Sequence, residues 1–302
     1  MTHRSPAPTS VVIVAYRRPR SLARMLMALL GGGYDVVVVN VGGDPEVDAA
    51  ARAAIVPARV ITVDNRGYAS AVNAGAVAAR GDVIVFTNDD VHLAVDVVDQ
   101  LADAVRTRAA DVALPRLVGR DGHEAGTPLA LPTPDRLLLE WALLPDQPVP
   151  VLRRRLAVEK WRRPATTERV AAGTAAVVAV RTDLLRDAPL PEAYFMYWEE
   201  VEWFWRLQEL GAHVVIVPAT TVVHDGGRHD VRPEKSRLLA RNAVRCVRRT
   251  QGVRAALLAY AVVVVWNARL LLGDVVRAKP RRRLEARLAG LQAALGSWIE
   301  VA

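Results

Sequence analysis

Short runs of consecutive apolar residues alternate, in the N-terminal third of the chain, with segments whose apolar residues follow a helical spacing. Residues 11–15 are mostly β-branched, which is typical of a strand buried on both faces. At 22–30 the apolar side chains recur at i, i+3, i+4, i+7 and i+8, the spacing of one helix face, and the glycines at 31–33 end the helix. The same patterns predict further strands at 36–39, 60–63 and 83–86 and further helices at 70–79 and 96–106.

Strands that alternate with helices predict an α/β fold, in which a mainly parallel sheet carries helices on both faces. Ligands bind such sheets at the carboxyl ends of the strands, so the polar residues that follow each strand are the first candidates for a site. These residues are Tyr16-Arg17-Arg18, Asn40, 64–67 and 88–90. The glycine patterns of dinucleotide-binding and P-loop proteins are absent from the sequence, so a nucleotide would have to be bound by another arrangement.

The composition is that of a globular protein, with 52% apolar and 24% charged residues in a chain of 302. Cys246 is the only cysteine, which excludes an intrachain disulfide and a zinc site built from several thiolates. The first ten residues lack the apolar stretch of a signal peptide, so we expect a cytoplasmic protein that is not exported.

The positive charge of the chain is gathered at its C-terminal end. Residues 228–302 contain sixteen Lys and Arg against five Asp and Glu, so the 227 residues before them carry a net charge of −3 within the overall +8. A charge concentrated at one end indicates a local anionic partner, whereas nucleic-acid binding by the whole fold would need basic residues spread across it.

An uninterrupted apolar run of twelve residues, 255–266, lies within this basic end. A membrane span needs about 20 residues, so we do not expect the run to cross a bilayer. The arginines on both sides of the run favour an in-plane helix on an anionic membrane, with Trp266 at the interface. The alternative is an apolar helix that packs on the rest of the fold or in a homodimer.

Three polar residues, Asn88, Asp89 and Asp90, stand just after the predicted strand at 83–86. Carboxylates at the end of a buried strand face the crevice in which ligands bind, and oxygen ligands there suit Mg²⁺ or Mn²⁺ carrying a diphosphate. Alternatively, the two aspartates cap the next helix.

A second segment combines asparagines with glycines at Asn65, Gly67, Asn73 and Gly75. Gly67 permits a tight turn, and Gly75 permits a close approach of the backbone to a neighbour. Taken alone, the segment favours an ordinary loop followed by a helix with a polar face.

Three glutamates, Glu199, Glu200 and Glu202, lie among aromatic and bulky apolar residues at 194–206. An apolar wall raises the pKa of a carboxylate toward the range of a general base. In a helix, Glu199 and Glu200 project about 100° apart, so we expect them to do different jobs, and Glu200 is the favoured functional residue. Glu202 is spaced for an i,i+4 ion pair with Arg206, which predicts a structural role for it.

His224 ends the second of two short β-branched runs and precedes Asp225 and two glycines. A histidine at a strand end, beside a flexible backbone, could complete a metal site with Asp90. The alternative is a structural histidine bonded to a neighbouring carbonyl.

The chain has six segments whose order suggests a family: VVIVAYRRP, NRGYASAVNAG, RGDVIVFTNDDV, VAAGTAAVVAVRTDLL, YFMYWEEVEWFWR and VVIVPATTVVHDGG. Over residues 9–230 this order resembles the inverting family 2 glycosyltransferases of the GT-A fold, most of all the bacterial rhamnosyltransferase-like and galactofuranosyltransferase-like branches. The Pro- and Arg-rich stretch 119–169, with basic motifs at 153–155 and 161–163, indicates an insertion on the acceptor side or, alternatively, a solvated connector. The resemblance implies a GT-A catalytic domain at 10–232 that includes this stretch. A flexible tail at 1–9 and a basic helical region at 233–302 would flank it.

The resemblance also implies a role for each motif. Asp90 matches the last acid of the family's DxD-like motif and, with His224, would hold a divalent cation, Mg²⁺ or Mn²⁺. Glu200 matches the second acid of a paired-acid motif, the proposed catalytic base. On the same grounds the nucleotide-sugar would contact Ala15, Tyr16, Arg18, Asn40, Asn65, Gly67, Asn73, Asn88 and Asp89, and the acceptor side would include Gly173, Thr174, Trp198 and Glu199.

Two positions depart from the family's usual residues. Asn40 stands where the family usually has an Asp that reads the nucleobase, although an amide oxygen can still accept a hydrogen bond from an imide N–H. Asn88 stands at the start of the DxD-like motif, so the cation would depend mainly on Asp90.

The implied activity is the inverting transfer of a hexosyl or deoxyhexosyl group from a UDP-, dTDP- or GDP-linked donor. The acceptor would be a hydroxyl of a glycan or polyprenyl-linked glycan in cell-wall or surface polysaccharide synthesis, and the enzyme would be peripheral on the inner face of the plasma membrane.

Two other functions compete with sugar transfer. A nucleotidyltransferase on a similar sheet would release diphosphate from a nucleoside triphosphate. A basic nucleic-acid-binding protein is disfavoured, because no basic sheet motif interleaved with aromatics is present and the acid clusters would repel phosphates. We therefore expect no nucleic-acid partner.

Overall fold

The central strands of the fold bury side chains on both faces, as their continuous apolar runs predict. In β1 (Ser10–Ala15), Val11 and Ile13 pack into the apolar layer on one face of the sheet, and Val12 packs into the layer on the other. The same alternation occurs in β2 (Asp35–Val41) and β4 (Val83–Asn88). The computed structural model describes residues 9–123, 129–143, 164–225 and 231–300.

The described strands form one nine-stranded sheet. Besides β1, β2 and β4 it contains β3 (Ala58–Val63), β5 (Val91–His92), β6 (Val112–Val118), β7 (Glu168–Arg169), β8 (Val177–Arg181) and β9 (Val214–His224). The spatial order is β3-β2-β1-β4-β8-β6-β9-β5, and β7 pairs with β9. Only β5, β7 and β8 run opposite to the other six, so the predicted mainly parallel sheet is confirmed.

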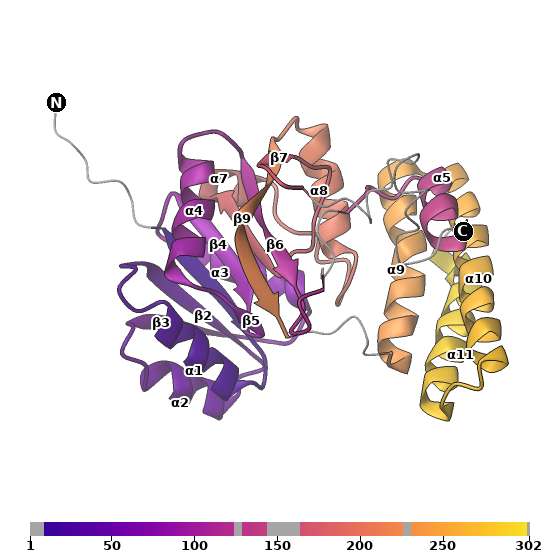
Figure 1. Cartoon of the computed structure of the whole chain (residues 1–302), viewed down its shortest axis with the longest axis horizontal. Coiled ribbons are helices and arrows are strands. Elements are labelled where there is room, and N and C mark those ends of the chain that lie inside the picture. The colour runs from indigo at the N-terminus through magenta and orange to yellow at the C-terminus, as the bar shows by residue number, and fades with distance from the viewer. Residues whose placement is uncertain (1–8, 124–128, 144–163, 226–230, 301–302) are drawn as a thin grey trace.

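Helices cover both faces of the sheet (Figure 1). The helices α1 (Pro19–Ala28), α2 (Pro45–Arg52) and α4 (Val95–Arg106) bury their apolar faces in one layer. The helices α3 (Tyr68–Ala78), α7 (Thr182–Asp187) and α8 (Glu199–Glu209) do so in the other. The three predicted helices of the N-terminal third are confirmed as α1, α3 and α4. Helix α2 was not foreseen, because it has only eight residues and few of them are large apolar residues.

Gly75 lets α3 lie close against the sheet. A Cβ atom at this position would come within 2.2 Å of Cγ1 of Val12 on β1 and 3.1 Å of Cγ2 of Val39 on β2. Both valines are fully buried in the core. The close approach predicted for Gly75 is therefore confirmed, with core side chains as the neighbours.

Three C-terminal helices form a bundle beside the sheet: α9 (Pro233–Gln251), α10 (Val253–Val276) and α11 (Arg281–Gly296), followed by the short η3 (Ser297–Glu300). Helix α9 faces the sheet, and α10 and α11 lie on the far side (Figure 1). A third apolar cluster joins the bundle to the rest of the chain through Tyr194, Trp198 and Leu137. The segments α5 (Pro134–Leu137) and η1 (Leu138–Leu143) pack on α10.

Helix α10 is longer than the apolar run of twelve residues suggested. It contains 24 residues and is long and apolar enough to cross a membrane, judged by length and composition only. The expectation that its length excludes a span is therefore wrong, because the helix continues past Asn267 and Arg269 into a second apolar stretch at 270–272.

Candidate active site

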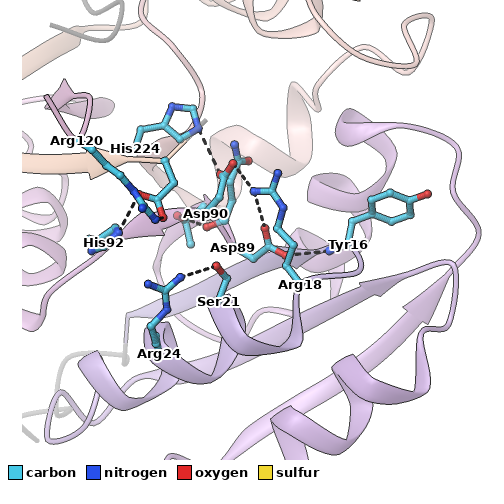
Figure 2. Close-up of polar contacts among 12 residues, drawn as sticks. Tyr16, Arg18, Ser21, Arg24, Asp89, Asp90, His92, Arg120 and His224 are labelled. Atoms are coloured by element: carbon cyan, nitrogen blue, oxygen red, sulfur yellow. Dashed lines mark hydrogen bonds and ion pairs between the residues drawn. The ribbon is translucent and has the colours of Figure 1, made fainter. Parts of the chain in front are cut away.

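The turn between β4 and β5 carries the two adjacent aspartates. The backbone N–H of Tyr16 donates a hydrogen bond to Oδ2 of Asp89 at 3.0 Å, and Nη1 of Arg18 donates to Oδ2 of Asp90 at 2.6 Å (Figure 2). The turns that follow β1 and β4 therefore meet, as expected for paired parallel strands. The alternative that these aspartates cap the next helix is wrong, because the N-cap of α4 is Ala94.

His224, at the end of β9, reaches the same turn from another part of the chain. Its Nε2 atom lies 3.3 Å from Oδ1 of Asp90 (Figure 2). Pairing between β9 and β5 places His224 opposite Val91, and the N–H of Asp225 donates to the carbonyl oxygen of Asp90 at 2.8 Å. The predicted proximity of Asp90 and His224 is therefore confirmed.

The two aspartates have opposite pKa shifts. Burial, together with the negative charge of Asp90, raises the pKa of Asp89 to about 6. Burial acts on Asp90 in the same direction, but hydrogen bonds and charges from His224 and Arg18 outweigh it and lower the pKa of Asp90. Asp90 is therefore the carboxylate that stays ionised, as a cation ligand must.

Asp90 and His224 fit a divalent cation as two neighbouring ligands. Oδ1 of Asp90 is shielded from solvent, and apart from the 3.3 Å contact with Nε2 of His224 it has no polar partner among the described residues. Two octahedral ligands at right angles, each about 2.1 Å from Mg²⁺, are about 3.0 Å apart, close to the 3.3 Å between these atoms. No group of three or more His, Cys, Asp or Glu that could hold a metal occurs in the described part of the chain, so phosphate and water oxygens would supply the other ligands.

Asp225, which the sequence did not single out, anchors the end of β9. Nε and Nη2 of Arg120 each lie 2.6 Å from one of its two carboxylate oxygens, and Nε2 of His92 lies 3.0 Å from Oδ1 (Figure 2). The hydrogen bond from Arg120, with the contribution of His92, lowers the pKa of Asp225 to about 2. This network holds the chain next to His224. Arg120 and His92 lie in segments without a recognisable motif. In the sequence, only the position of Asp225 next to His224 could have pointed to this network.

The second carboxylate pair begins helix α8, directly after a strained turn. Tyr197 and Trp198 both have positive φ, 67° and 79°, a conformation that costs a residue other than glycine about 1–3 kcal/mol. Nδ2 of Asn242, on α9, donates to the carbonyl oxygens of Met196 and Tyr197, each at 3.0 Å. A side chain of the C-terminal bundle therefore supports the turn from which Glu199 and Glu200 project, and no sequence pattern marked it.

Burial dominates the electrostatics of both glutamates. The Oε2 atoms of Glu199 and Glu200 are shielded from solvent and have no hydrogen-bond partner among the described residues. Burial raises the pKa of Glu200, and burial together with the charge of Glu200 raises that of Glu199. A carboxyl group with a raised pKa is suited to accept a proton near neutral pH.

Glu202 has the structural role expected of it. It is buried and accepts hydrogen bonds from Tyr194, Arg206 and Arg249. Its i,i+4 ion pair with Arg206 is therefore confirmed, and Arg249 adds a partner from α9.

Gly67, in the segment of asparagines and glycines at 65–75, lies against the glutamate-containing segment at 194–206. Its φ of +106° and the position of a Cβ atom, 2.2 Å from the carbonyl oxygen of Phe195, both require glycine here. The N–H of the next residue, Tyr68, donates to that same oxygen at 3.1 Å. The tight turn predicted at Gly67 is thus confirmed, and it also fixes the strained turn before α8.

Tyr68 connects the two carboxylate sites. Its hydroxyl donates to the carbonyl oxygen of Ala175 at 2.7 Å. Burial raises the pKa of Tyr68, and so do the negative charges of Glu199, Glu200 and Asp90. The N–H of Asn88 donates to the adjacent carbonyl, that of Ala176, and the N–H of Tyr68 donates to Phe195, so Tyr68 lies between the end of β4 and the turn before α8.

A cavity of about 330 Å³ opens beside Glu200. Residues 129–140, the start of α8, and Leu239 and Trp266 of the C-terminal bundle form its mainly apolar walls. Trp266 also lines this cavity, and its place at a membrane interface stays a prediction. The cavity contact of 129–137 agrees with an acceptor-side insertion, whereas the basic motifs at 153–155 and 161–163 lie outside the described residues.

Two of the asparagines predicted to bind the donor are engaged within the fold. Nδ2 of Asn40 donates to the carbonyl oxygen of Asp44 and to Asp48, at 2.8 and 3.2 Å, and its Oδ1 accepts from the N–H of Asp44 at 3.0 Å. Asn73 exchanges hydrogen bonds with the backbone of Leu190, at 2.9 and 3.0 Å. Both side chains hold loops in the free protein, and their contact with a nucleotide stays a prediction.

The remaining predicted site residues lie where strands of the sheet end or close to the strained turn. Tyr16 and Asn65 are exposed after β1 and β3, whereas Ala15 is buried as the last residue of β1. The N–H of Asn88, the last residue of β4, donates to the carbonyl oxygen of Ala176. The acceptor-side residues Gly173, Thr174 and Trp198 are buried or half-buried.

Known proteins resemble this chain in sequence and in fold. The family described as Glycosyl transferase family 2 matches residues 10–177. The uncharacterized glycosyltransferase YwdF of Bacillus subtilis (strain 168) is 30% identical over 102 residues, 32% of this chain and 38% of that protein's length. The crystal structure of GalNAc-T7 with UDP, GalNAc and Mn²⁺ has a TM-score of 0.58 at 15% identity, covering 97% of this chain and 56% of the other. S. aureus TarS 1–349 has a TM-score of 0.53 at 14% identity, covering 98% and 92%.

Proposed function

The chain belongs to glycosyl transferase family 2, and on this basis we propose that it transfers a hexosyl or deoxyhexosyl group from a nucleotide-diphosphate sugar to an acceptor hydroxyl, with inversion at the anomeric carbon. The observation that most supports this proposal is the position of Tyr68, whose hydrogen bonds to Ala175 and Phe195 link the end of β4, which leads to Asp90, with the turn that leads to Glu200, because the reaction needs a cation ligand and a base in one site. We assign the transfer to residues 10–232 and treat 233–302 as a second, helical region.

Glu200 acts in this proposal as the general base. Its carboxylate accepts the proton of the acceptor hydroxyl while the oxygen bonds to the anomeric carbon and the bond to the diphosphate oxygen breaks. Burial, which raises the pKa of Glu200, makes it a stronger base than an exposed glutamate. A positioned base contributes about 10²–10⁴-fold to such a reaction.

Asp90 and His224 act on the donor side. They would hold Mg²⁺ or Mn²⁺ against the diphosphate, and that ion, when bound, offsets the negative charge of the leaving group. The guanidinium of Arg18, 2.6 Å from Asp90, stands beside the same position and would contact a phosphate oxygen. The donor is of the UDP, dTDP or GDP type, and the UDP and Mn²⁺ in the GalNAc-T7 structure provide a precedent on this fold.

We place the acceptor in the cavity beside Glu200. Its apolar walls and the ring of Trp198 suit a sugar attached to a hydrophobic carrier, such as a polyprenyl-linked glycan. Gly173, Thr174 and Glu199 would border the acceptor side. These features support a role in cell-wall or surface polysaccharide synthesis, with the protein peripheral on the inner face of the plasma membrane.

A screen of nucleotide-sugars tests the proposed reaction. The purified protein is incubated with UDP-, dTDP- and GDP-sugars, with and without Mn²⁺, and thermal stability and slow donor hydrolysis are measured. We expect one nucleotide class to stabilise the protein only with Mn²⁺, by about 2.7 kcal/mol at a donor concentration 100 times its Kd. Release of diphosphate from nucleoside triphosphates alone would instead identify a nucleotidyltransferase. Salt-dependent retention on nucleic acid without sugar turnover would identify a nucleic-acid-binding protein.

A further inference from the structure

Helix α10 exposes many of its large apolar side chains to solvent instead of burying them. Its buried residues are two alanines, two valines and two polar residues: Ala256, Ala259, Val262, Val263, Asn267 and Asp274. Its outward face carries Leu258, Val265, Leu272 and Val276 at a helical spacing, each between 57% and 76% exposed, with the exposed Arg269 between Val265 and Leu272. Only 22% of its most apolar 18-residue window is buried, which is unlike the core helix of a soluble protein.

Helix α11 repeats this pattern on the neighbouring surface. Its buried residues are Ala286, Ala289, Gly290 and Ala294, while the larger apolar side chains at its end point to solvent. A Cβ atom at Gly290 would lie 2.6 Å from Oδ1 of Asn267, so a small residue is what lets α11 approach α10. Helices that pack through small residues and turn their large apolar residues outward are typical of a lipid environment.

Together, α10, α11 and η3 present what we call the outer apolar face. It consists of Leu258, Val265, Leu272 and Val276 of α10, Leu288 and Leu295 of α11, and Trp298 and Ile299 of η3. Helices α10 and α11 pack on each other and lie on the side away from the sheet (Figure 1). The rings of Tyr260 and Trp298, 5.6 Å apart, join α10 to η3.

Basic residues lie at the ends of this face. Arg254 is exposed in the first turn of α10, and Arg277, Lys279, Arg281 and Arg282 are exposed where α10 connects to α11. The buried acid on α10, Asp274, is neutralised by Arg283 and Arg287 at 2.8 and 2.9 Å. A large apolar surface bordered by positive charge complements a bilayer with anionic headgroups.

A crossing of the bilayer by α10 does not fit its neighbours. Helix α9 packs along α10, and its exposed residues include Arg237, Arg241 and Arg249. A transmembrane α10 would carry these arginines into the hydrocarbon region, which is costly. An in-plane position keeps them in water.

We propose that the outer apolar face is a membrane-docking surface, on which α10 and α11 lie in the plane of an anionic bilayer. This inference rests on the proposed peripheral location and deepens it by naming the contact surface. It also places the acceptor cavity next to the bilayer, because Trp266 of α10 forms part of the cavity wall. A glycan held by a lipid anchor would then reach Glu200 without leaving the membrane.

Vesicle flotation tests the surface separately from the reaction. The full-length protein is mixed with phosphatidylcholine vesicles, with or without about 30% phosphatidylglycerol, and the bound fraction is measured. We expect binding to anionic vesicles and a decrease of about tenfold for the triple variant Leu258→Glu, Val265→Glu and Leu272→Glu. Donor stabilisation by nucleotide-sugar and Mn²⁺ should be unchanged in this variant, which separates failure of docking from failure of the proposed function.

A matched control places three new glutamates on exposed apolar residues of the sheet domain. Ile55, Val77 and Leu210 are 68%, 78% and 64% exposed, comparable to the residues changed on α10. The triple variant Ile55→Glu, Val77→Glu and Leu210→Glu should bind vesicles as the wild type does. Equal loss of binding in both triple variants would overturn the proposal, because net charge alone would then explain it.

Site-directed labelling distinguishes in-plane docking from crossing. Cys246 is fully buried, so a thiol-reactive fluorophore introduced through Leu258→Cys, Val265→Cys or Leu272→Cys reports on that position. Lipid-borne quenchers at different depths should place all three at similar, shallow depths. If the fluorophore at position 265 lies much deeper in the bilayer than those at 258 and 272, α10 crosses the membrane. If the protein instead forms a dimer, does not bind vesicles, and loses the dimer in the α10 triple variant, the face belongs to an interface with a second copy. Both this result and the depth profile of a span would contradict in-plane membrane docking.

Discussion

Nε2 of His224 lies 3.3 Å from Oδ1 of Asp90, although one residue ends β9 and the other precedes β5. The pairing of β5 with β9 brings them together, and Asp225 reinforces it through its bond to the backbone of Asp90. The same histidine and the guanidinium of Arg18 keep Asp90 ionised. This pair is therefore where we expect cation dependence to originate.

Replacing Asp90 should remove that dependence. The Asp90→Asn variant keeps the side-chain shape but loses the charge, so we expect Mn²⁺ affinity in the presence of a nucleoside diphosphate to fall by at least about 10–100-fold. Calorimetric titration with Mn²⁺ measures this. The variant Asp103→Asn, at an exposed position of α4, is the control and should titrate as the wild type does. Equal Mn²⁺ affinity in the two variants would remove Asp90 from the site.

Glu200→Gln should abolish sugar transfer while leaving donor binding intact. The amide is nearly isosteric but cannot accept the proton, so we expect the transfer rate to fall by about 10²–10⁴-fold. Measurement of kcat tests the loss of transfer, and measurement of the Kd for the nucleotide-sugar tests whether donor binding is retained. Glu209→Gln, at the other end of α8, should change neither quantity. A near wild-type rate for Glu200→Gln would rule out this residue as the base.

The transfer rate should rise with pH through a pKa above the ordinary glutamate value. Burial raises the pKa of Glu200, and a base works only when ionised, so activity is low below that pKa and levels off above it. A pH series of kcat with saturating donor and Mn²⁺ locates the midpoint, which we expect above that of an exposed glutamate. A rate that does not change with pH from acid to neutral would contradict the assignment of a buried carboxylate as base.

Asn242→Ala should slow catalysis without weakening donor binding. The variant loses two hydrogen bonds to the strained turn before α8, at a cost of about 1–3 kcal/mol, and frees Glu200 from its position. We expect kcat to fall about tenfold at unchanged donor Kd, because small misplacements of a reacting group are costly. The acid limb of the pH profile should also shift, which a loss of stability alone would not produce. Asn242→Gln, which retains the amide, should restore part of the rate.

Glu202→Gln should destabilise the fold, most of all near neutral pH. Burial opposes ionisation of Glu202, but bonds from Arg249 and Tyr194 and the charges of Arg206 and Arg249 outweigh it and lower its pKa. The stability it supplies is therefore present above the unfolded pKa and is lost as pH falls through the folded one. Both arginines are partly exposed and can be hydrated, so we expect about 2–3 kcal/mol rather than the full cost of a broken buried pair. Urea unfolding of variant and wild type at neutral and acid pH measures this difference, which should shrink in acid.

Local patterns were sufficient to predict the sheet and its flanking helices. A β-branched run such as 11–15 has few alternatives to a strand buried on both faces, and the spacing at 22–30 buries one face of a helix whatever its neighbours are. Gly67 and Gly75 were also foreseeable as special positions. Glycine in a folded chain costs conformational entropy, so it is expected where a positive φ angle or a close neighbour excludes a side chain. The contacts that these glycines make with Phe195 and Val12 were not foreseeable.

The sequence by itself determined the class of fold and the family, because these follow from residue order and periodicity over short windows. The tertiary structure decided which side chains meet. It placed Asn242 of α9 under the turn that leads to Glu200, engaged Asn40 and Asn73 in holding loops, and turned Trp266 into the cavity wall. Those outcomes depend on the packing of distant segments, whose relative rotation and register no local pattern encodes.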